Sequence, residues 1–317
     1  MNTRDETVRA MKISVVTSLH NSARHIDELY ARVSRSLLAI TPEFEVILVN
    51  DGSPDDSLAV AVNLQQRTGP RVKVIDLSRN FGQHKALLTG LRHASGDLIF
   101  MMDSDLEEDP ELIESFYRIY ADAPAEVDVV YGVQTRRQGD AFRKISGHLS
   151  YKLFNLLSPI PAPENPTPFR LMTRRYVDGL LSFHEREVSF VGLFLLTGFS
   201  GIAVPIVKHN TTQTSYTLAR KLALFVDAVT SFSNLPLMFI FQAGLLMSAF
   251  SLGYLLLILV RYLAFGAGVS GWTSLIMSIW MVGGIVVFSL GVIGIYLSKI
   301  FVEVKQRPLT IVKKIYE

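Results

Sequence analysis

Two long stretches without a charged residue constrain this chain of 317 residues more than any other feature of its sequence. Residues 228–260 and 262–298 contain no Asp, Glu, Lys or Arg, and only eight charged residues follow Asp227. Each stretch is longer than the ~20 apolar residues that cross a bilayer as a helix. The sequence therefore predicts a polar N-terminal domain over 1–215 and two transmembrane helices, over about 235–260 and 274–298.

Charges near these helices predict how the chain crosses the membrane. The loop between the helices holds Arg261 as its only charge, whereas the tail over 299–317 holds five basic and two acidic residues. Basic segments stay on the cytoplasmic side, so we expect a cytoplasmic tail, and two crossings return the N-terminal domain to that side. The N-terminus lacks the apolar core of a signal peptide. We expect a multi-pass protein of the inner (cytoplasmic) membrane.

Two further segments are amphipathic. Residues 216–234 come directly before the first predicted membrane helix and separate apolar from charged side chains, which is typical of a juxtamembrane helix in the membrane interface. An ordinary helix that packs against a domain is the alternative. Residues 141–157 have a similar pattern and are expected to form an interfacial helix within the N-terminal domain.

Composition excludes several classes of protein. Hydrophobic residues make up 49% of the chain, enough to build a core, which excludes a disordered protein. The net charge of +2 gives no reason to expect nucleic acid as a partner. The chain has no cysteine, so disulfides and thiolate metal sites are excluded.

Short apolar runs alternate with helical patterns through the N-terminal domain. The predicted strands are 12–19, 44–49, 72–77, 97–102 and 127–133, and the predicted helices are 22–40, 55–67, 83–94 and 110–121. This alternation indicates an α/β fold with a doubly wound, mostly parallel sheet. Ligands of such sheets bind at the carboxyl ends of the strands.

Carboxylates follow the predicted strand 97–102. Asp103 and Asp105 are two residues apart, and Glu107 lies two residues further on. Mg²⁺ and Mn²⁺ take oxygen ligands and often bridge to substrate phosphates. We therefore expect these three residues to hold a divalent cation. A solvated acidic loop that caps the next helix at Pro110 is the alternative.

Other polar residues fall at the same predicted edge of the sheet. Asp51 follows the strand 44–49 in a sequence typical of a turn, and it could accept a hydrogen bond from a nucleotide base. Asp76 and Asn80 lie at and after the end of the strand 72–77. Lys85 opens the next helix, at the end that favours anions. Each is a candidate for binding a nucleotide sugar, with an ordinary surface position as the alternative.

Four sequence runs resemble family 2 glycosyltransferases of the GT-A fold. They are SVVTSLHNS at 14–22, VNDGSPDDS at 49–57, LSRNFGQHKALLTGL at 77–91 and ASGDLIFMMDSDLEEDPELI at 94–113. Later runs are similar to membrane-anchored polyprenyl-phosphate glycosyltransferases, the group of dolichol-phosphate-mannose-synthase-like and bactoprenol-glucosyltransferase-like enzymes. These are GVQTRR at 132–137, YKLFN at 151–155, FRLMTRR at 169–175 and SFSNLPL at 231–237. The resemblance covers about residues 12–300.

The resemblance implies a donor site and a catalytic role for the paired carboxylates. Asp51 would contact the nucleotide base, and Asp103 would lie near the ribose and the metal. Asp105 and Glu107 would hold Mg²⁺ or Mn²⁺ on the donor diphosphate. The cation would neutralise charge that develops on the departing nucleoside diphosphate.

The resemblance also implies an acceptor site in the region of the predicted interfacial helix. Arg136, Arg137 and Arg143, with Ser146, would hold the phosphate of the lipid. A guanidinium group suits that task because its forked donors match phosphate oxygens. Contact with lipid headgroups is the alternative for these arginines.

Three positions depart from the family pattern. Pro168 stands before Phe169 where the family usually has an acidic residue. Basic residues are common in the family near Val191 and near Asn210. The first departure removes a candidate catalytic base, which matters less for a phosphate acceptor because that nucleophile is already an anion.

The reaction that the resemblance implies is inverting transfer of a sugar from a UDP-sugar to undecaprenyl or dolichyl phosphate. The product would be a lipid-linked sugar donor for glycosylation of the cell envelope. Expected partners are the nucleotide sugar, the polyprenyl phosphate, the membrane and further copies of this chain. A processive polysaccharide synthase is one alternative, although both tryptophans, Trp272 and Trp280, lie in the membrane region and not in a Gln-x-x-Arg-Trp motif. The other is a non-catalytic membrane scaffold that retains a degenerate sugar-nucleotide site.

Overall fold

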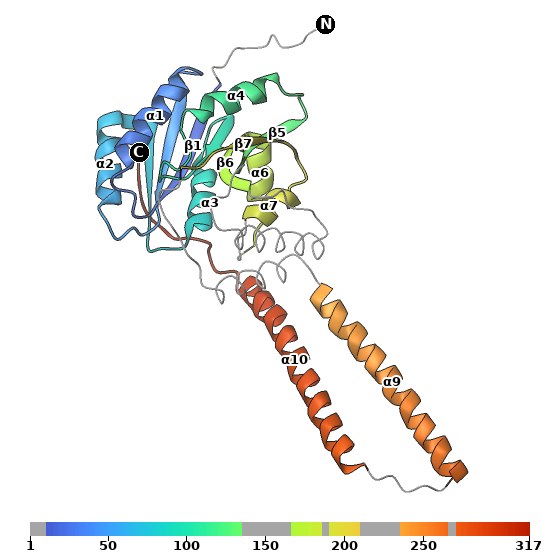
Figure 1. The fold of residues 1–317 in the computed structure, drawn as a ribbon. Helices are drawn as coiled ribbons and strands as arrows, with labels where there is room; N and C mark the ends of the chain where they lie inside the picture. The colour runs from blue at the N-terminus through green and yellow to red at the C-terminus, as the bar shows by residue number, and fades with distance from the viewer. Residues whose placement is uncertain (1–10, 135–165, 186–189, 210–234, 266–270) are drawn as a thin grey trace. The chain divides into compact units, whose positions relative to one another are not determined.

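The protein is described by a computed structural model over residues 11–134, 166–185, 190–209, 235–265 and 271–317 (Figure 1). The chain divides into two compact units. The sheet unit comprises residues up to Tyr151, Ile160–Ser215 and Arg307–Glu317. The helical unit consists mainly of Tyr216–Gln306.

The sheet unit is built around one mixed sheet. Its strands are β1 (Ile13–Leu19), β2 (Phe44–Asn50), β3 (Val72–Leu77), β4 (Leu98–Met101), β5 (Val127–Gln134), β6 (Pro166–Thr173), β7 (Ser200–Ile206) and β8 (Val312–Tyr316). They lie in the order β7-β5-β6-β4-β1-β2-β3-β8. The neighbours β4, β1, β2 and β3 are parallel, whereas β6 is antiparallel to β4 and β5, and β8 is antiparallel to β3. The expected α/β fold is confirmed: β5 and β7 are parallel to each other, and among the described strands only β6 and β8 run against the rest of this mixed sheet.

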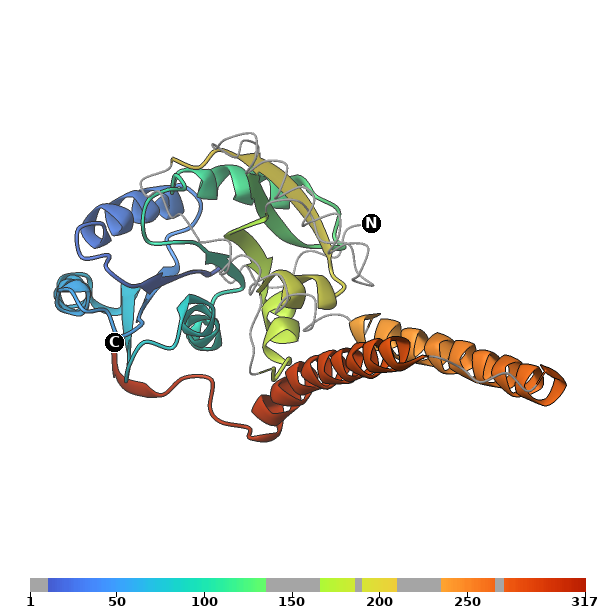
Figure 2. The same cartoon turned by 60° about the horizontal axis from the view of Figure 1, so that its bottom comes forward.

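Helices cover both faces of this sheet (Figure 2). One face packs against α1 (Ile26–Leu38), α2 (Ser57–Thr68) and α4 (Leu112–Asp122), and the other packs against α3 (Gln83–His93), α6 (Arg174–Leu181) and α7 (Phe190–Leu196). A short 3-10 helix, η1 (Gly69–Arg71), leads into β3. Alternate strand residues such as Val15 and Val16 face different clusters, so the central strands are apolar throughout.

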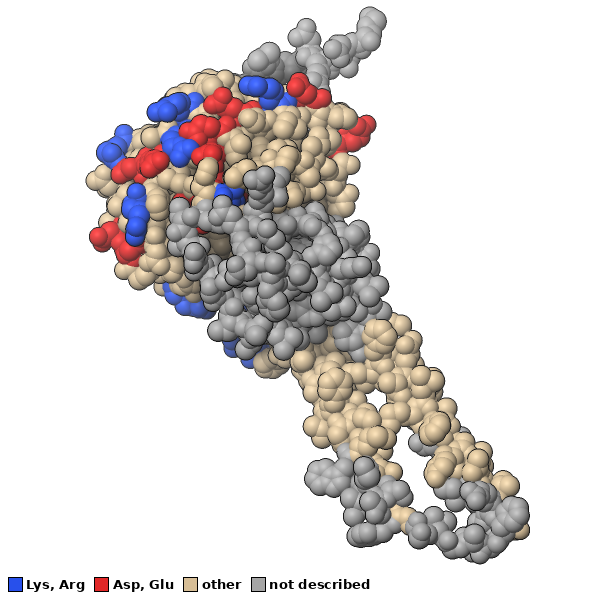
Figure 3. Space-filling model, viewed as in Figure 1, with Lys and Arg blue, Asp and Glu red and all other residues tan. Residues whose placement is uncertain are grey.

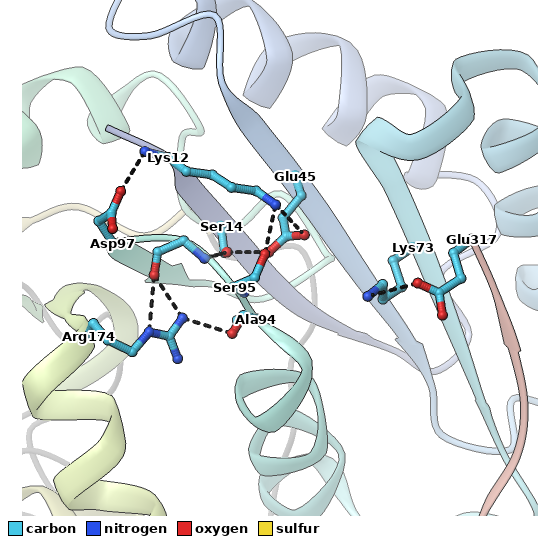
Figure 4. A network of polar contacts seen from close by, with 10 residues as sticks. Lys12, Ser14, Glu45, Lys73, Ala94, Ser95, Asp97, Arg174 and Glu317 are labelled. Atoms are coloured by element: carbon cyan, nitrogen blue, oxygen red, sulfur yellow. Dashed lines mark hydrogen bonds and ion pairs between the residues drawn. The ribbon is translucent and has the colours of Figure 1, made fainter. Parts of the chain in front are cut away.

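A buried polar network joins the amino ends of β1, β2 and β4 (Figure 4). Glu45, 6% exposed, accepts hydrogen bonds from the hydroxyl groups of Ser14 (2.6 Å) and Ser95 (2.9 Å) and from the Ser95 amide (2.7 Å). Lys12 Nζ lies 3.1 Å from the second carboxylate oxygen of Glu45. Arg174 donates to the carbonyl oxygen of Gly96 at 2.8 Å. The buried Glu45 carboxylate and the donors around it therefore connect the strands at this end of the sheet.

The helical unit contains α9 (Leu235–Phe265) and α10 (Trp272–Val304), at the two segments that the sequence predicts to span a membrane. Among the described residues, Met281–Val304 has the length and apolar composition of a membrane span, and a shorter apolar stretch is Leu237–Met247. Charged side chains gather on the sheet unit in Figure 3, and the described surface of α9 and most of α10 shows none in that view. A second span is therefore a prediction and not an observation.

The C-terminal residues do more than form a tail. Helix α10 continues to Val304, beyond the predicted end at 298, and β8 then joins the sheet beside β3. The segment 299–317 thus ends as a strand of the sheet unit. The predicted helices over 141–157 and 216–234 lie outside the described residues.

Candidate functional site

The loops that follow β1, β2, β3 and β4 meet at one edge of the sheet, because the carboxyl ends of parallel strands lie together. The hydroxyl groups of Ser22 and Ser104 are 2.8 Å apart and join the loop after β1 to the loop after β4. The Asn80 side-chain amide lies 3.2 Å from Nδ1 of His20, which joins the loops after β3 and β1. A hydrogen bond of 2.8 Å from the Asn21 amide to the Ser53 hydroxyl group adds the loop after β2, so the four loops form one connected site.

Asp51 and Gly52 lock the turn after β2 onto the loop after β3. The Asp51 carboxylate, in a residue 2% exposed, accepts hydrogen bonds from the amides of Phe81 (2.7 Å) and Gly82 (2.9 Å). Gly52 has a φ of +56°, and a Cβ atom there would lie 2.4 Å from the backbone nitrogen of Asn80. Asp51 therefore organises the neighbouring loop in this structure. Its contact with a nucleotide base stays a prediction.

Replacing Gly52 with alanine is expected to destabilise the sheet unit by about 1–3 kcal/mol, because the new Cβ meets backbone and the residue must keep a left-handed φ. Gly69→Ala is a matched control, since Gly69 has a φ of +65° but no atom within 4 Å of the added Cβ. Urea unfolding of the two variants should show the larger loss for Gly52→Ala. Equal losses would mean that the close approach contributes nothing.

Asp76, Asn80 and Lys85 lie around the same pair of loops. Asp76 is 4% exposed, and its Oδ1 accepts a hydrogen bond from the Asn50 side-chain amide at 2.8 Å. Asn80 Oδ1 accepts the Gly82 amide at 3.0 Å. Lys85 lies in the first turn of α3, where its own amide donates to the carbonyl oxygen of Gly82 at 3.0 Å. Their assignment to a nucleotide sugar stays a prediction.

Asp103 and Asp105 follow β4 and have different surroundings. Asp103, with a side chain 14% exposed, accepts a hydrogen bond from Gln83 Nε2 at 2.7 Å, and its other oxygen lies 3.5 Å from Lys208 Nζ. Burial raises the pKa of Asp103 above its ordinary value, although the charge of Lys208 acts in the other direction. The Oδ1 atom of Asp105 accepts the Glu107 amide at 3.0 Å and closes a tight turn.

Lys208 and Glu108 form a buried ion pair that the sequence did not predict. Lys208 Nζ lies 3.1 Å from Oε1 of Glu108, and the Glu108 side chain is 1% exposed. Burial, together with the negative charge of Asp103, raises the pKa of Glu108 to about 7. Burial would lower the pKa of Lys208, but Glu108 and Asp103 outweigh it and raise that pKa. One cation, whose side chain is 14% exposed, thus faces two carboxylates, two residues before Asn210, near which the family pattern has a basic residue.

A divalent cation fits these residues as part of a shared ligand set. Within the described ranges, no three Asp, Glu or His side chains come together as a group that could hold a metal ion. Proteins usually bind Mg²⁺ through one or two carboxylates and complete its shell with substrate phosphates and water. Asp103 and Asp105 supply two such carboxylates on the loop that follows β4. Together with a diphosphate they would hold a cation whose charge offsets that of the phosphates; Glu107 as a third ligand stays a prediction.

Pro168 lies on β6 two residues before Arg170, so both side chains belong to one face of that strand. Arg170 is 3% exposed and donates to the carbonyl oxygens of Thr167 (2.9 Å) and Pro168 (3.3 Å). Burial lowers the pKa of Arg170 to about 10. The Arg170 guanidinium therefore donates to backbone carbonyl oxygens of Thr167 and Pro168, and Pro168 is the position at which the family usually has an acidic side chain.

Of the remaining predicted positions, the structure describes the backbone of one. Val191 belongs to α7. The predicted acceptor residues and one departure from the family pattern lie outside the described residues: Arg136, Arg137, Arg143, Ser146 and Asn210. Their roles stay predictions.

Comparison with known proteins finds relatives along nearly the whole chain. The sequence profile described as Glycosyl transferase family 2 matches residues 14–181. A protein of Mycobacterium tuberculosis described as a glycosyltransferase is 46% identical over 96% of this chain and 89% of its own length. The bactoprenol glucosyl transferase of Shigella phage SfII is 32% identical over 96% of this chain and 98% of its own length. The undecaprenyl-phosphate 4-deoxy-4-formamido-L-arabinose transferase of Klebsiella pneumoniae is 28% identical over 96% and 93%.

Proposed function

Because this chain belongs to glycosyltransferase family 2, we propose that it transfers a sugar from a UDP-sugar to a polyprenyl phosphate held in the membrane. The observation that carries the donor half of this proposal is the pair Asp103 and Asp105 at the end of β4. The pair lies at the same edge as the loops that Asp51 and Gly52 lock together. This arrangement offers carboxylates for a cation and backbone for a nucleotide at one end of a GT-A-like sheet.

The acceptor half of the proposal rests on the relatives and on the chemistry of phosphate. Two relatives carry names that specify bactoprenol or undecaprenyl phosphate. A lipid phosphate is already anionic, so it can attack without a base at Pro168. Its oxygen forms the bond to the anomeric carbon from the face opposite the nucleotide, the bond to the diphosphate breaks, and UDP leaves. We assign the grip on the lipid phosphate to Arg136, Arg137, Arg143 and Ser146.

The membrane topology that fits this reaction has two crossings and a cytoplasmic sheet unit. The chain leaves the sheet unit before α9 and re-enters it as β8, which pairs with β3. Strands β7 and β8, which come before and after α9 and α10 in the chain, thus belong to one sheet, which supports an even number of crossings. Nucleotide sugars are made in the cytoplasm, and the basic residues after α10 favour the same side. The lipid-linked sugar would then serve glycosylation of the cell envelope.

The native chain has no cysteine, so single cysteines can report its topology directly. We expect a membrane-impermeant maleimide to label Ser270→Cys, between α9 and α10, in intact spheroplasts. Lys305→Cys, just after α10, should react only after the membrane is permeabilised. The two variants control for each other, since only the side of the membrane should separate them. Labelling of Lys305→Cys in intact spheroplasts would contradict the cytoplasmic placement.

The proposed reaction is tested with membranes that contain the full chain. They are incubated with undecaprenyl phosphate and one radiolabelled donor at a time, namely UDP-glucose, UDP-N-acetylglucosamine or GDP-mannose, and then extracted with organic solvent. We expect extractable label with a UDP-sugar, and only when the lipid phosphate is present. Label in an insoluble polymer would favour a polysaccharide synthase instead. UDP binding without any transfer would favour a non-catalytic scaffold.

A further inference from the structure

The C-terminal segment, defined as residues 309–316, is built into the sheet unit although it follows α10 in the chain. Leu309 is 6% exposed and packs in the hydrophobic cluster that contains α3. Strand β8 pairs with β3, and Glu317 beyond it forms an ion pair of 3.1 Å with Lys73 (Figure 4). The segment thus contributes a strand to the sheet and a buried residue, Leu309, to the hydrophobic core.

This segment holds the loop over residues 78–82 from its outer side. The amide of Ser78, the first residue of the loop, donates to the carbonyl oxygen of Ile311 at 2.9 Å. The hydroxyl group of Thr310 lies 2.7 Å from that of Thr89, on the helix that follows the loop. Asp51 holds the same loop from its inner side through the Phe81 and Gly82 amides. The loop is therefore fixed between β2 and the C-terminal segment.

A β-bulge in β8 brings a positive charge to the end of β3. Leu77 pairs with Val312 and Asp76 pairs with Lys314, so Lys313 is an extra residue in the ladder. Bulges re-aim a side chain, and here Lys313 Nζ lies 3.6 Å from Oδ2 of Asp76. The Lys313 side chain is 68% exposed, whereas that of Asp76 is 5% exposed. The bulge thus gives a buried carboxylate at the candidate donor site a solvent-facing counter-ion.

We propose that the C-terminal segment is a positioning element for the donor nucleotide, and that Lys313 contributes through its ion pair with Asp76. The proposal rests on the function proposed above, because it takes the nucleotide to bind beside Asp76 and the loop 78–82. A loop that is ordered before the ligand arrives loses less conformational freedom on binding, so its ligand binds more tightly. Residues at the far end of the chain thereby set the affinity for the donor.

The first test is calorimetric binding of UDP with Mg²⁺ to the full-length protein in detergent. Lys313→Ala should raise the Kd about 3-fold, as expected for loss of a largely exposed ion pair. Lys314→Ala is the matched control: it removes the same charge one residue away, where the ammonium lies over the Tyr316 ring. Its Kd should stay at the wild-type value. Equal effects of the two lysines would overturn a specific role for Lys313.

The second test is hydrogen exchange at residues 78–82 without nucleotide, which does not depend on the donor assignment. A chain that ends at Pro308 should exchange faster at Ser78 and bind UDP about 10-fold more weakly, equivalent to one lost hydrogen bond. If that chain does not fold, Thr310→Val and Lys313→Ala decide by the same two measurements. The proposal would be overturned if the wild-type protein binds UDP but these variants keep both the wild-type exchange at Ser78 and the wild-type Kd for UDP. If wild-type protein binds no UDP, the donor assignment fails, and exchange alone decides whether the segment holds the loop.

Discussion

Replacing Asp105 with alanine is expected to reduce sugar transfer by at least about 10³-fold, or ~4 kcal/mol of transition-state stabilisation. The substitution removes one of the two carboxylates that would hold the cation, and it also removes the acceptor of the Glu107 amide. Asp105→Asn separates these effects, because an amide oxygen can keep the turn but lacks the charge. We expect the asparagine variant to be folded and nearly as inactive as the alanine variant.

The measurement is initial transfer rate to lipid phosphate, together with the affinity for UDP at several Mg²⁺ concentrations. Asp122→Ala, which removes an exposed carboxylate at the end of α4, is a control that should retain full activity. Near-normal transfer by Asp105→Ala, or by wild-type protein in EDTA, would contradict the role of the carboxylate pair in holding a cation.

Replacing Glu45 with alanine is expected to destabilise the sheet unit by about 3 kcal/mol, because one partner of a buried charged network is lost. This is the lower end of the usual range, since the Lys12 side chain is 35% exposed and can regain water. Glu43→Ala is the matched control: Glu43 is the same residue type, two positions earlier, and its side chain is exposed. Unfolding by urea should show a loss for Glu45→Ala and almost none for Glu43→Ala.

The same carboxylate predicts a dependence of stability on pH. Burial alone would raise the pKa of Glu45, but hydrogen bonds from Ser14, Ser95 and Lys12 outweigh it and lower that pKa from the ordinary 4.5. The stabilisation is therefore complete above about pH 4.5, the unfolded value, and is lost as pH falls through the lower folded value. Glu45→Gln should flatten this acid limb of the stability curve. An unchanged limb would show that other carboxylates control acid unfolding.

The inner part of the fold was predictable because burial on both faces makes its strands apolar throughout. The five predicted strands correspond to β1–β5, and the predicted helices between them correspond to α1–α4. The three strands that were not predicted carry a weaker signal, and one of them, β6, lies between β5 and β4 and not at a side of the sheet. Pro166 and Pro168 interrupt the pattern of β6, and β7 is largely exposed along its length. In β8, the consecutive lysines Lys313 and Lys314 interrupt the alternation of apolar and polar residues that is typical of a strand, and the partner strand β3 lies far away in the chain.

The candidate site was predictable only where chain order and spatial order agree. Asp51 and Asp103 each follow a buried strand, so the rule that ligands bind at carboxyl ends locates both. The ion pair of Glu108 and Lys208 joins residues 100 positions apart, and no local sequence pattern predicts such a contact. The spacing of Asp103, Asp105 and Glu107 suggested a three-carboxylate group, whereas Glu108 is the acidic residue that turns toward Lys208 and the interior.

The pairing of β8 with β3 also sets the order in which this protein can be completed during its synthesis. Until residues 312–316 leave the ribosome, the described sheet has no partner on the outer side of β3, and the hydrogen-bonding groups of that strand stay open to other chains. Both apolar helices are translated before this partner exists. The sheet therefore gains this partner only after α9 and α10 have been made, and a nascent chain stalled within α10 has an unpaired β3 edge and lacks the contact of Ile311 with the loop 78–82.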